Sequence, residues 1–143
     1  MAIQRRGSAV WNGGLKDGRG VVSTASGVLS KTPYSFTARF EEGAGTNPEE
    51  LIAAAHAGCF SMALSGQLGN AGMTAESINT TATVSLEKTD GGFSITKIHL
   101  DVTARIPGAD RAAFETATQN AKAGCPVSKL FNAEITMEAR LEA

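Results

Sequence analysis

The chain has 143 residues, the length of one ordinary domain, and its 42% hydrophobic and 19% charged residues are typical of a globular protein. The formal net charge is −1 without any run of basic residues, which argues against a nucleic-acid or anionic-membrane surface. No apolar stretch approaches the ~20 residues needed to span a bilayer, and residues 1–7 are not followed by an apolar signal core. We therefore expect one domain, residues 1–143, in a reducing cytoplasm.

The first forty residues are expected to form three short strands separated by turns. Residues 9–11 precede Asn12-Gly13-Gly14, a strong turn signal, and residues 21–24 form a second β-prone run. From Tyr34 to Phe40, aromatic or alanine residues alternate with polar ones, the period of a half-buried strand. This pattern predicts that Arg39 lies on the polar side of the third strand.

A long helix is predicted next. Residues 46–50 combine a capping side chain, a proline at the first helical position and two acids in the first turn. Residues 51–71 are almost all apolar or small, and Gly72 is the expected stop. A helix that is apolar all round is buried, and a chain of this length has limited sheet to cover it. We therefore expect a homodimer in which two such helices pack together.

The second half of the chain contains three further predicted strands. Residues 78–86 and 93–106 flank a hairpin signal at residues 89–92. The apolar phase slips near Thr96–Lys97, which indicates a β-bulge in the second of these strands. Apolar residues alternate again from Ile135 to Leu141, which predicts the last strand.

One more helix lies between these strands. Asp110 is its expected N-cap, the helix runs through Ala123, and Gly124 ends it. Cys125-Pro126 then opens a short helical turn. The predicted order is β-β-β-α-β-β-α-β, and strands that do not alternate with helices indicate the α+β class.

The chain has two cysteines, Cys59 and Cys125. In a reducing compartment such a pair is reactive, metal-binding or inert rather than a structural disulfide. Cys59 lies in the middle of the apolar helix, where a free cysteine is commonly a small buried hydrophobe. Cys125 lies close to a helix N-terminus, whose dipole favours a thiolate. Local chemistry therefore favours Cys125 as readily as Cys59.

A reactive cysteine needs a neighbouring cation, and Arg39 is a candidate, although an ordinary solvated arginine has the same pattern. Glu49 or Glu50 would orient such an arginine through a bidentate pair. Glu49 precedes Cys59 by ten residues, or about 15 Å along a helix. Either the arginine spans this gap, the helix starts late, or antiparallel helices in a dimer bring one chain's Glu49 toward the other's Cys59.

The two histidines offer a weaker pattern. His56 precedes Cys59 by three residues and shares its helix face, so that His56, Cys59 and Cys125 together suit zinc. A core or interface histidine is the plainer interpretation of His56. His99 alternates with apolar residues in a strand and is expected to be solvated.

Residues 45–64 resemble the signature of the OsmC/Ohr family, and residues 121–128 resemble its second motif. The opening Trp11 and the segments 23–29 and 33–36 resemble the OsmC branch in particular, so that the likeness runs from end to end. The resemblance implies an OsmC-like α+β fold and an intertwined homodimer with two active sites at its interface. It also implies a cysteine-based peroxidase that prefers organic hydroperoxides and uses no metal or prosthetic group.

The same resemblance implies a role for each site residue. Cys59 matches the peroxidatic cysteine and Cys125 the resolving one, while Arg39 matches the arginine of the OsmC branch and Glu49 the acid after the proline. The Ohr branch takes its arginine from an earlier strand, which makes Arg19 a rival. The intramolecular disulfide would be reduced by an external dithiol of lipoyl or thioredoxin type, in oxidative and osmotic stress defence.

Two other classes of protein stay open on the sequence alone. One is a dimeric binding or stress-structural protein whose thiols are incidental, and the other is a zinc-bound thiol protein. Thiol counting before and after one equivalent of cumene hydroperoxide separates the enzyme from the first, and elemental analysis separates it from the second.

Overall fold

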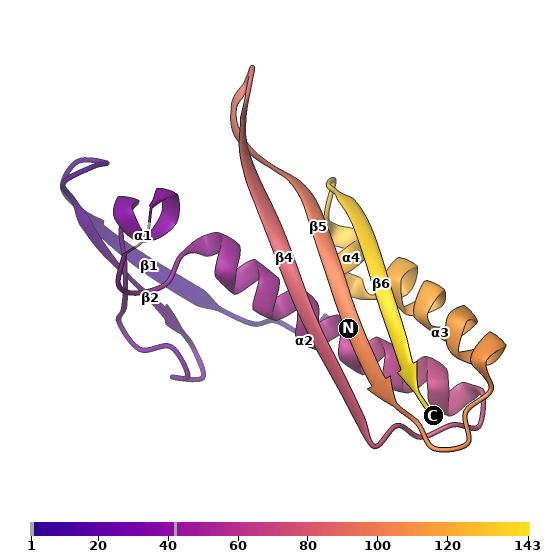
Figure 1. Cartoon of the computed structure of the whole chain (residues 1–143). Coiled ribbons are helices and arrows are strands. Elements are labelled where there is room, and N and C mark those ends of the chain that lie inside the picture. Colours follow the sequence, from indigo (N-terminus) through magenta and orange to yellow (C-terminus); the bar gives the residue numbers. More distant parts are fainter. Residues whose placement is uncertain (1, 42) are drawn as a thin grey trace. The chain divides into compact units, whose positions relative to one another are not determined.

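The structure, a computed structural model, describes residues 2–41 and 43–143. The chain forms two compact units, Met1–Leu51 and Ile52–Ala143. A long helix, α2 (Pro48–Asn70), begins at the end of the first unit and continues into the second (Figure 1). Consecutive strands are followed by consecutive helices and do not alternate with them one by one, so the α+β class predicted from the sequence is confirmed.

The first unit is a small antiparallel sheet in the order β1-β2-β3. Its elements are β1 (Gly7–Asn12), β2 (Arg19–Thr24), β3 (Thr32–Tyr34) and the short helix α1 (Phe36–Phe40). Trp11 and Tyr34 flank Gly20 across the sheet, and their ring centroids lie 5.3 Å apart. A Cβ at Gly20 would lie 2.4 Å from the Tyr34 ring, so only glycine lets the two rings meet over the sheet.

The predicted strand from Tyr34 to Phe40 is wrong, because the strand ends at Tyr34 and a helix follows. The Ser35 hydroxyl accepts a hydrogen bond of 3.2 Å from the backbone three residues on, which caps the new helix. Helical spacing then brings the Phe36 and Phe40 rings to a centroid distance of 4.8 Å. Arg39 consequently lies over the Phe40 ring, at 5.2 Å from its centroid, and not on an opposite polar face.

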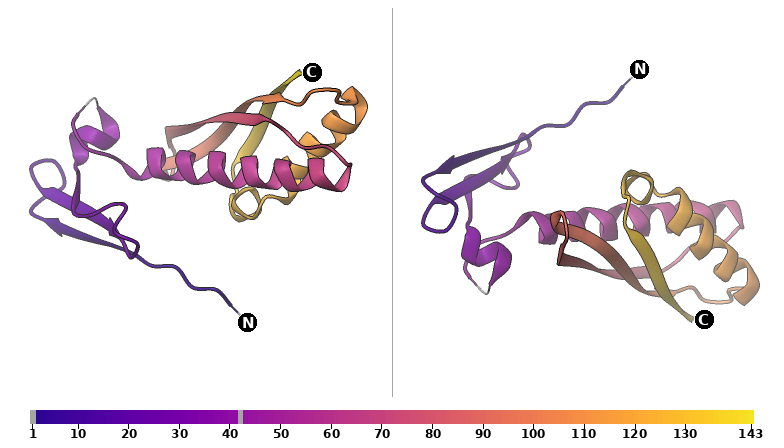
Figure 2. Two further views of the ribbon diagram at one scale, coloured as in Figure 1. Left: turned by 90° about the horizontal axis from the view of Figure 1, so that it is seen from below. Right: turned by 90° about the horizontal axis from the view of Figure 1, so that it is seen from above.

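The second unit is a three-stranded sheet with helices on one face, as both views of Figure 2 show. Its strands are β4 (Ser77–Thr89), β5 (Gly92–Arg105) and β6 (Glu134–Glu142), and its helices besides α2 are α3 (Arg111–Gly124) and α4 (Pro126–Leu130). Strands β4 and β5 are an antiparallel hairpin, whereas β5 and β6 are parallel. The parallel pair is possible because α3 and α4 carry the chain back across the sheet.

The core of this unit lies between the helices and the sheet. Side chains four residues apart on α2 meet alternate side chains of β5 and one face of α3. The residues of these three elements that form the buried apolar cluster are Phe60, Leu64, Leu68, Leu100, Val102, Ala104, Phe114, Ala117 and Ala121. Cys125, which joins α3 to α4, belongs to the same cluster.

Several local predictions for this unit are confirmed. Ser85 pairs with Lys97 and the next residue of β4 pairs with Ile95, so Thr96 is the extra residue of a β-bulge. Asp110 accepts a hydrogen bond from the backbone of Ala113 and caps α3. The short helical turn predicted at Cys125-Pro126 is confirmed as α4, whereas α1 is an element that the prediction lacked.

Helix α2 is not buried on every side within the single chain, where we expected from the sequence too little sheet to cover it. One row of side chains faces the core, whereas Met62 is 79% exposed and a Cβ added at Gly58 or Gly66 would meet nothing within 4 Å. The helix also has the length and the mean hydropathy, 1.3, of a membrane span, contrary to the sequence-based expectation. Helices of protein cores satisfy the same two criteria, and Phe60 and Leu64 of α2 lie in such a core.

Candidate functional site

The structure brings the two cysteines together. Cys59 lies on α2 and is half-buried, whereas Cys125 is the joint between α3 and α4 and is fully buried. Both are free thiols, and the Cys125 thiol donates a hydrogen bond to the Cys59 sulfur across 2.8 Å. Because the sulfur atoms are already in contact, a bond between them requires little movement of either helix.

The surroundings of Cys59 favour the neutral thiol. Burial raises the pKa of Cys59, and the neighbouring Cys125 raises it further, first through the hydrogen bond between the two thiols and then through the repulsion between two adjacent thiolates. A hydrogen bond from the Val127 backbone N–H opposes both effects. Among the described residues, none of the groups that shift this pKa is a cation. A positive charge brought close to this sulfur would lower its pKa and favour the thiolate.

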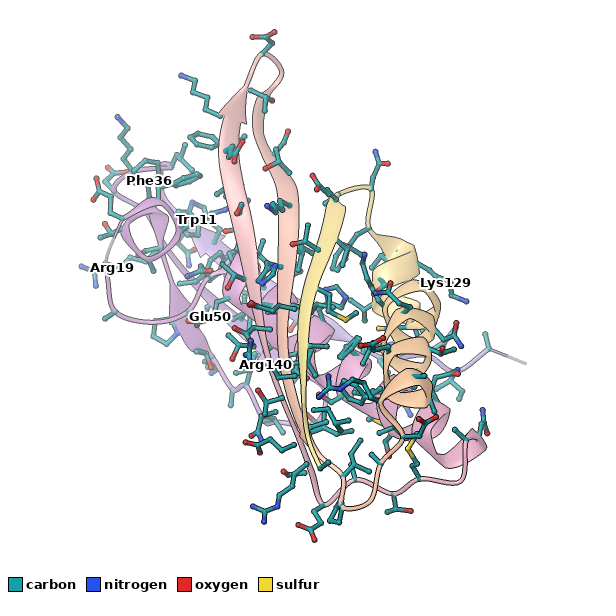
Figure 3. All side chains as sticks on the ribbon, turned by 45° about the vertical axis from the view of Figure 1, so that its right-hand side comes forward. Trp11, Arg19, Phe36, Glu50, Lys129 and Arg140 are labelled. Atoms are coloured by element: carbon teal, nitrogen blue, oxygen red, sulfur yellow. The ribbon has the colours of Figure 1, made fainter. Side chains whose placement is uncertain are left out.

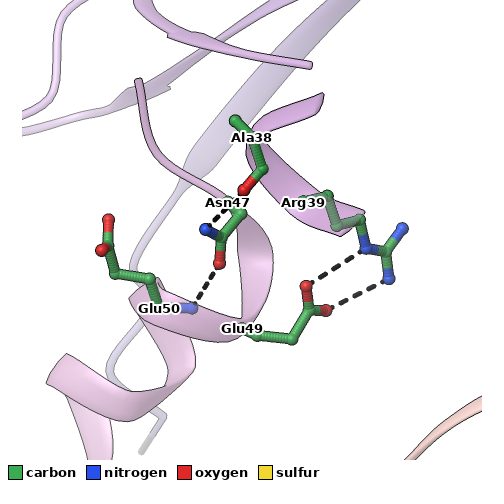
Figure 4. Close-up of polar contacts among 5 residues, drawn as sticks. All are labelled: Ala38, Arg39, Asn47, Glu49 and Glu50. Atoms are coloured by element: carbon green, nitrogen blue, oxygen red, sulfur yellow. Dashed lines mark hydrogen bonds and ion pairs between the residues drawn. The ribbon is translucent and has the colours of Figure 1, made fainter. Parts of the chain in front are cut away.

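Arg39 and Glu49 form a bidentate pair in the first unit (Figure 4). Arg39 Nε donates to Glu49 Oε1 and Arg39 Nη2 to Glu49 Oε2, each across 3.2 Å. The Glu49 side chain is 11% exposed and that of Arg39 is 40% exposed. The pair thus fixes the guanidinium plane while part of the guanidinium stays accessible to another molecule.

Asn47 links the two segments that carry Arg39 and Glu49. Its side-chain amide donates to the Ala38 carbonyl across 2.9 Å, and its carbonyl accepts from the Glu50 backbone across 2.8 Å (Figure 4). One side chain therefore caps α2 and ties it to α1. The Glu50 carboxylate is taken by Thr46, whose hydroxyl donates to it across 2.7 Å. Of the two acids left open by the sequence, Glu49 is the one that meets Arg39.

An apolar cleft of about 250 Å³ lies beside Arg39. It is lined mainly by aromatic side chains, and its lining residues are Trp11, Leu15, Tyr34, Ser35, Phe36, Arg39 and Phe40. Such a cleft suits a small apolar group with a polar end near the guanidinium. The rival Arg19 begins β2 and lines another cleft, of about 350 Å³, together with Lys16 and Asp17.

His56 hydrogen-bonds a serine and does not form the zinc site that its spacing from Cys59 suggested. Its Nε2 lies 2.7 Å from the Ser128 hydroxyl, and both side chains are buried. Across residues 2–41 and 43–143, no cluster of three or more His, Cys, Asp or Glu side chains has the arrangement of a metal site. Ser128 was missed by sequence reasoning, although it follows Cys125 by three residues in the second motif. His99, expected to be solvated, is half-buried and hydrogen-bonds Thr136 across 2.7 Å.

These features define a dithiol protein of α+β fold. A half-exposed cysteine on a long helix contacts a buried one, and a bidentate arginine–carboxylate pair lies at the start of the same helix. Residues 41–140 match the family described as OsmC-like protein. The chain belongs to the OsmC family.

Relatives cover the whole chain. Peroxiredoxin OsmC of Escherichia coli is 57% identical over 143 residues, which is 100% of each chain. The organic hydroperoxide resistance protein OhrB of Bacillus subtilis is 28% identical over 124 residues, 86% of this chain and 89% of the relative. Among solved structures, the organic hydroperoxide resistance protein OsmC of Legionella pneumophila superposes with a TM-score of 0.68, at 27% identity and 100% coverage of both chains.

Proposed function

We propose that the protein is a cysteine-based peroxidase that reduces organic hydroperoxides to alcohols. Two observations support the class: the 57% identity to a relative named Peroxiredoxin OsmC, and the thiol–thiol contact of 2.8 Å. The contact carries the proposal, because the sulfenic acid formed on the peroxidatic cysteine escapes over-oxidation when a resolving thiol beside it condenses with it. The two thiols together supply the two electrons of the reduction, so no metal or prosthetic group is needed.

The exposure of the two sulfurs supports their division of roles. Cys59 is half-buried and accessible to a peroxide, whereas Cys125 is 0% exposed. The Cys59 thiolate attacks one peroxide oxygen, the S–O bond forms as the O–O bond breaks, and the alkoxide leaves as the alcohol after taking a proton. The Cys125 thiol then attacks the sulfenic sulfur, so that a Cys59–Cys125 disulfide forms and water leaves.

Arg39 is proposed to activate Cys59, with Glu49 holding the guanidinium. The pKa of Cys59 is raised in the isolated chain, and a cation close to the sulfur would lower it. Helix α2 is continuous between Glu49 and Cys59, which separates them by about 15 Å along one helix. The pair is therefore proposed to serve the cysteine of a partner subunit.

A homodimer supplies that partner. Gly58, Met62 and Gly66 follow one another at four-residue spacing on α2 and are exposed, so they form an open row opposite the buried one. Glycines in such a row let a second helix approach closely. Two copies packed along this row would bury both α2 helices, as the composition of the helix demands, and would make residues 1–143 one OsmC-like domain.

The apolar cleft beside Arg39 supports an organic substrate. Its rings would hold the carbon chain, while the guanidinium meets the peroxide oxygens and the departing alkoxide. An external dithiol, of lipoyl or thioredoxin type, reduces the disulfide and is itself oxidised. We place this chemistry in the cytoplasm, in defence against oxidative and osmotic stress.

The experiment that tests the function is peroxide consumption by three proteins with dithiothreitol present. Wild type turns over cumene hydroperoxide, Cys59→Ser is inactive, and Cys125→Ser reacts but accumulates sulfinic and sulfonic forms of Cys59. Full turnover by Cys59→Ser contradicts the proposal.

A further inference from the structure

A buried hydrogen bond connects the segments that carry the two cysteines. His56 Nε2 lies 2.7 Å from Ser128 Oγ, with exposed fractions of 0% for His56 and 6% for Ser128. His56 lies one helical turn before Cys59 on α2, and Ser128 lies one turn after Cys125 on α4. The bond therefore spans the same two elements as the sulfur–sulfur contact, one turn away from it.

The position of the α4 helix depends on its tertiary contacts, among them the packing of Val127 against the core. The helix is only five residues long, and its N-cap, Cys125, makes no side-chain capping bond. A helix this short does not persist without tertiary contacts. Ser128 is the buried residue of this helix, whereas Lys129 points away from the sheet (Figure 3). The Phe131 ring adds an edge contact to His56 at a centroid distance of 5.3 Å.

The His56 ring is suited to this task because it is neutral. Its Nδ1 is buried and has no hydrogen-bond partner among the described residues. An imidazolium would leave that N–H unsatisfied, so the arrangement fits a neutral ring whose Nε2–H donates to the Ser128 hydroxyl. Burial lowers the pKa of His56, which agrees with this assignment.

We propose that His56 and Ser128 are a positioning pair that holds Cys125 against Cys59 and so favours formation of their disulfide. The inference rests on the proposed function for its biological meaning, although the disulfide itself can be measured without peroxide. Losing the bond frees the α4 turn and lowers the effective concentration of the Cys125 thiol at Cys59, which the equilibrium of the disulfide reports directly.

The chain supplies a matched control. His99 Nδ1 and Thr136 Oγ1 also lie 2.7 Å apart and join two elements of the same unit, β5 and β6, but neither element carries a cysteine. Ser128 also lines a cleft of about 230 Å³, so Ser128→Thr has room for its methyl group and keeps the hydroxyl. His56→Gln places an amide nitrogen near the former Nε2 position.

The test compares Ser128→Ala, Ser128→Thr, His56→Gln and Thr136→Ala in glutathione redox buffers, with thiols trapped and counted. Ser128→Ala is expected to lower the equilibrium constant for the Cys59–Cys125 disulfide about tenfold, the loss of one net hydrogen bond. Ser128→Thr and His56→Gln retain most of the wild-type equilibrium constant, and Thr136→Ala does not change it.

Three results overturn the positioning pair: an unchanged equilibrium in Ser128→Ala, an equal fall in Thr136→Ala, or an equal fall in Ser128→Thr. Circular dichroism confirms that each variant is folded. A wild-type protein that ignores peroxide would contradict the proposed function alone, because the glutathione equilibrium would still report on the pair.

Discussion

Cys125 donates a hydrogen bond to Cys59 across 2.8 Å, although 66 residues separate the two along the chain. One sulfur is accessible and the other is enclosed by the core. This asymmetry orders the proposed reaction, since a peroxide meets Cys59 first and the sulfenic acid then meets Cys125. The joint between α3 and α4 is what places the second sulfur, because Cys125 ends one helix and begins the next.

Replacing Arg39 should slow the attack on peroxide. Arg39→Lys keeps the charge but loses the bidentate pair with Glu49, and a charge-assisted hydrogen bond of this kind is worth about ten- to hundredfold in rate. Stopped-flow oxidation of Cys59 measures the effect. Arg19→Lys is the matched control and keeps the wild-type rate. The reverse outcome, a slow Arg19 variant beside a normal Arg39 variant, would assign the activation to Arg19.

Mixing an inactive variant with a slow one tests which subunit supplies the arginine. Cys59→Ser retains Arg39, and Arg39→Ala retains Cys59, so a mixed dimer holds one complete site only if the pair acts across the interface. We expect activity to rise after unfolding and refolding the two together, approaching a quarter of the wild-type value for random pairing. If activity does not rise while mixed dimers are present, the arginine acts within its own chain.

A charge on the open row of α2 should dissociate the dimer. Met62 is 79% exposed in the single chain and lies between Gly58 and Gly66 on that row. Met62→Asp would bury an unpaired carboxylate in the dimer, so analytical ultracentrifugation should show monomer at concentrations where wild type is a dimer. Val28→Asp is the control, at a residue 84% exposed and outside α2. If the Met62→Asp variant is still a dimer, the interface lies elsewhere.

Acid should destabilise the protein through His56. Because burial lowers the pKa of His56 in the folded state, the unfolded chain binds more protons once the pH falls below the ordinary histidine value of about 6.5. Stability is therefore present at neutral pH and lost as the pH drops through this window. Urea unfolding at pH 7 and pH 5.5 should show a larger loss for wild type than for His56→Gln. Equal losses would mean that His56 does not carry the effect.

Much of the local structure could be predicted from the sequence because the signals are short-range. The Asn47 cap, the hairpin at residues 89–92 and the bulge at Thr96 each depend on neighbours in the chain or on the alternation of one strand. The joint at Cys125 follows from Gly124 and Pro126, which stand on either side of it in the sequence. These features also place Cys125 at the joint between two helices.

The misses have physical reasons. Alternation from Tyr34 to Phe40 fits a strand, but the Ser35 cap and the Phe36–Phe40 ring contact favour a helical turn instead. The bond between His56 and Ser128 joins residues 72 apart, and no local pattern marks such a contact. The open row of α2 could not be separated from its buried row by composition, because small and apolar residues occupy both.

The most direct test of the account is to count thiols and map disulfides after one equivalent of cumene hydroperoxide. We predict that both thiols of each chain disappear, and that mass spectrometry of a digest finds Cys59 joined to Cys125 of the same chain. Unchanged thiols, or a disulfide only between chains, would contradict it.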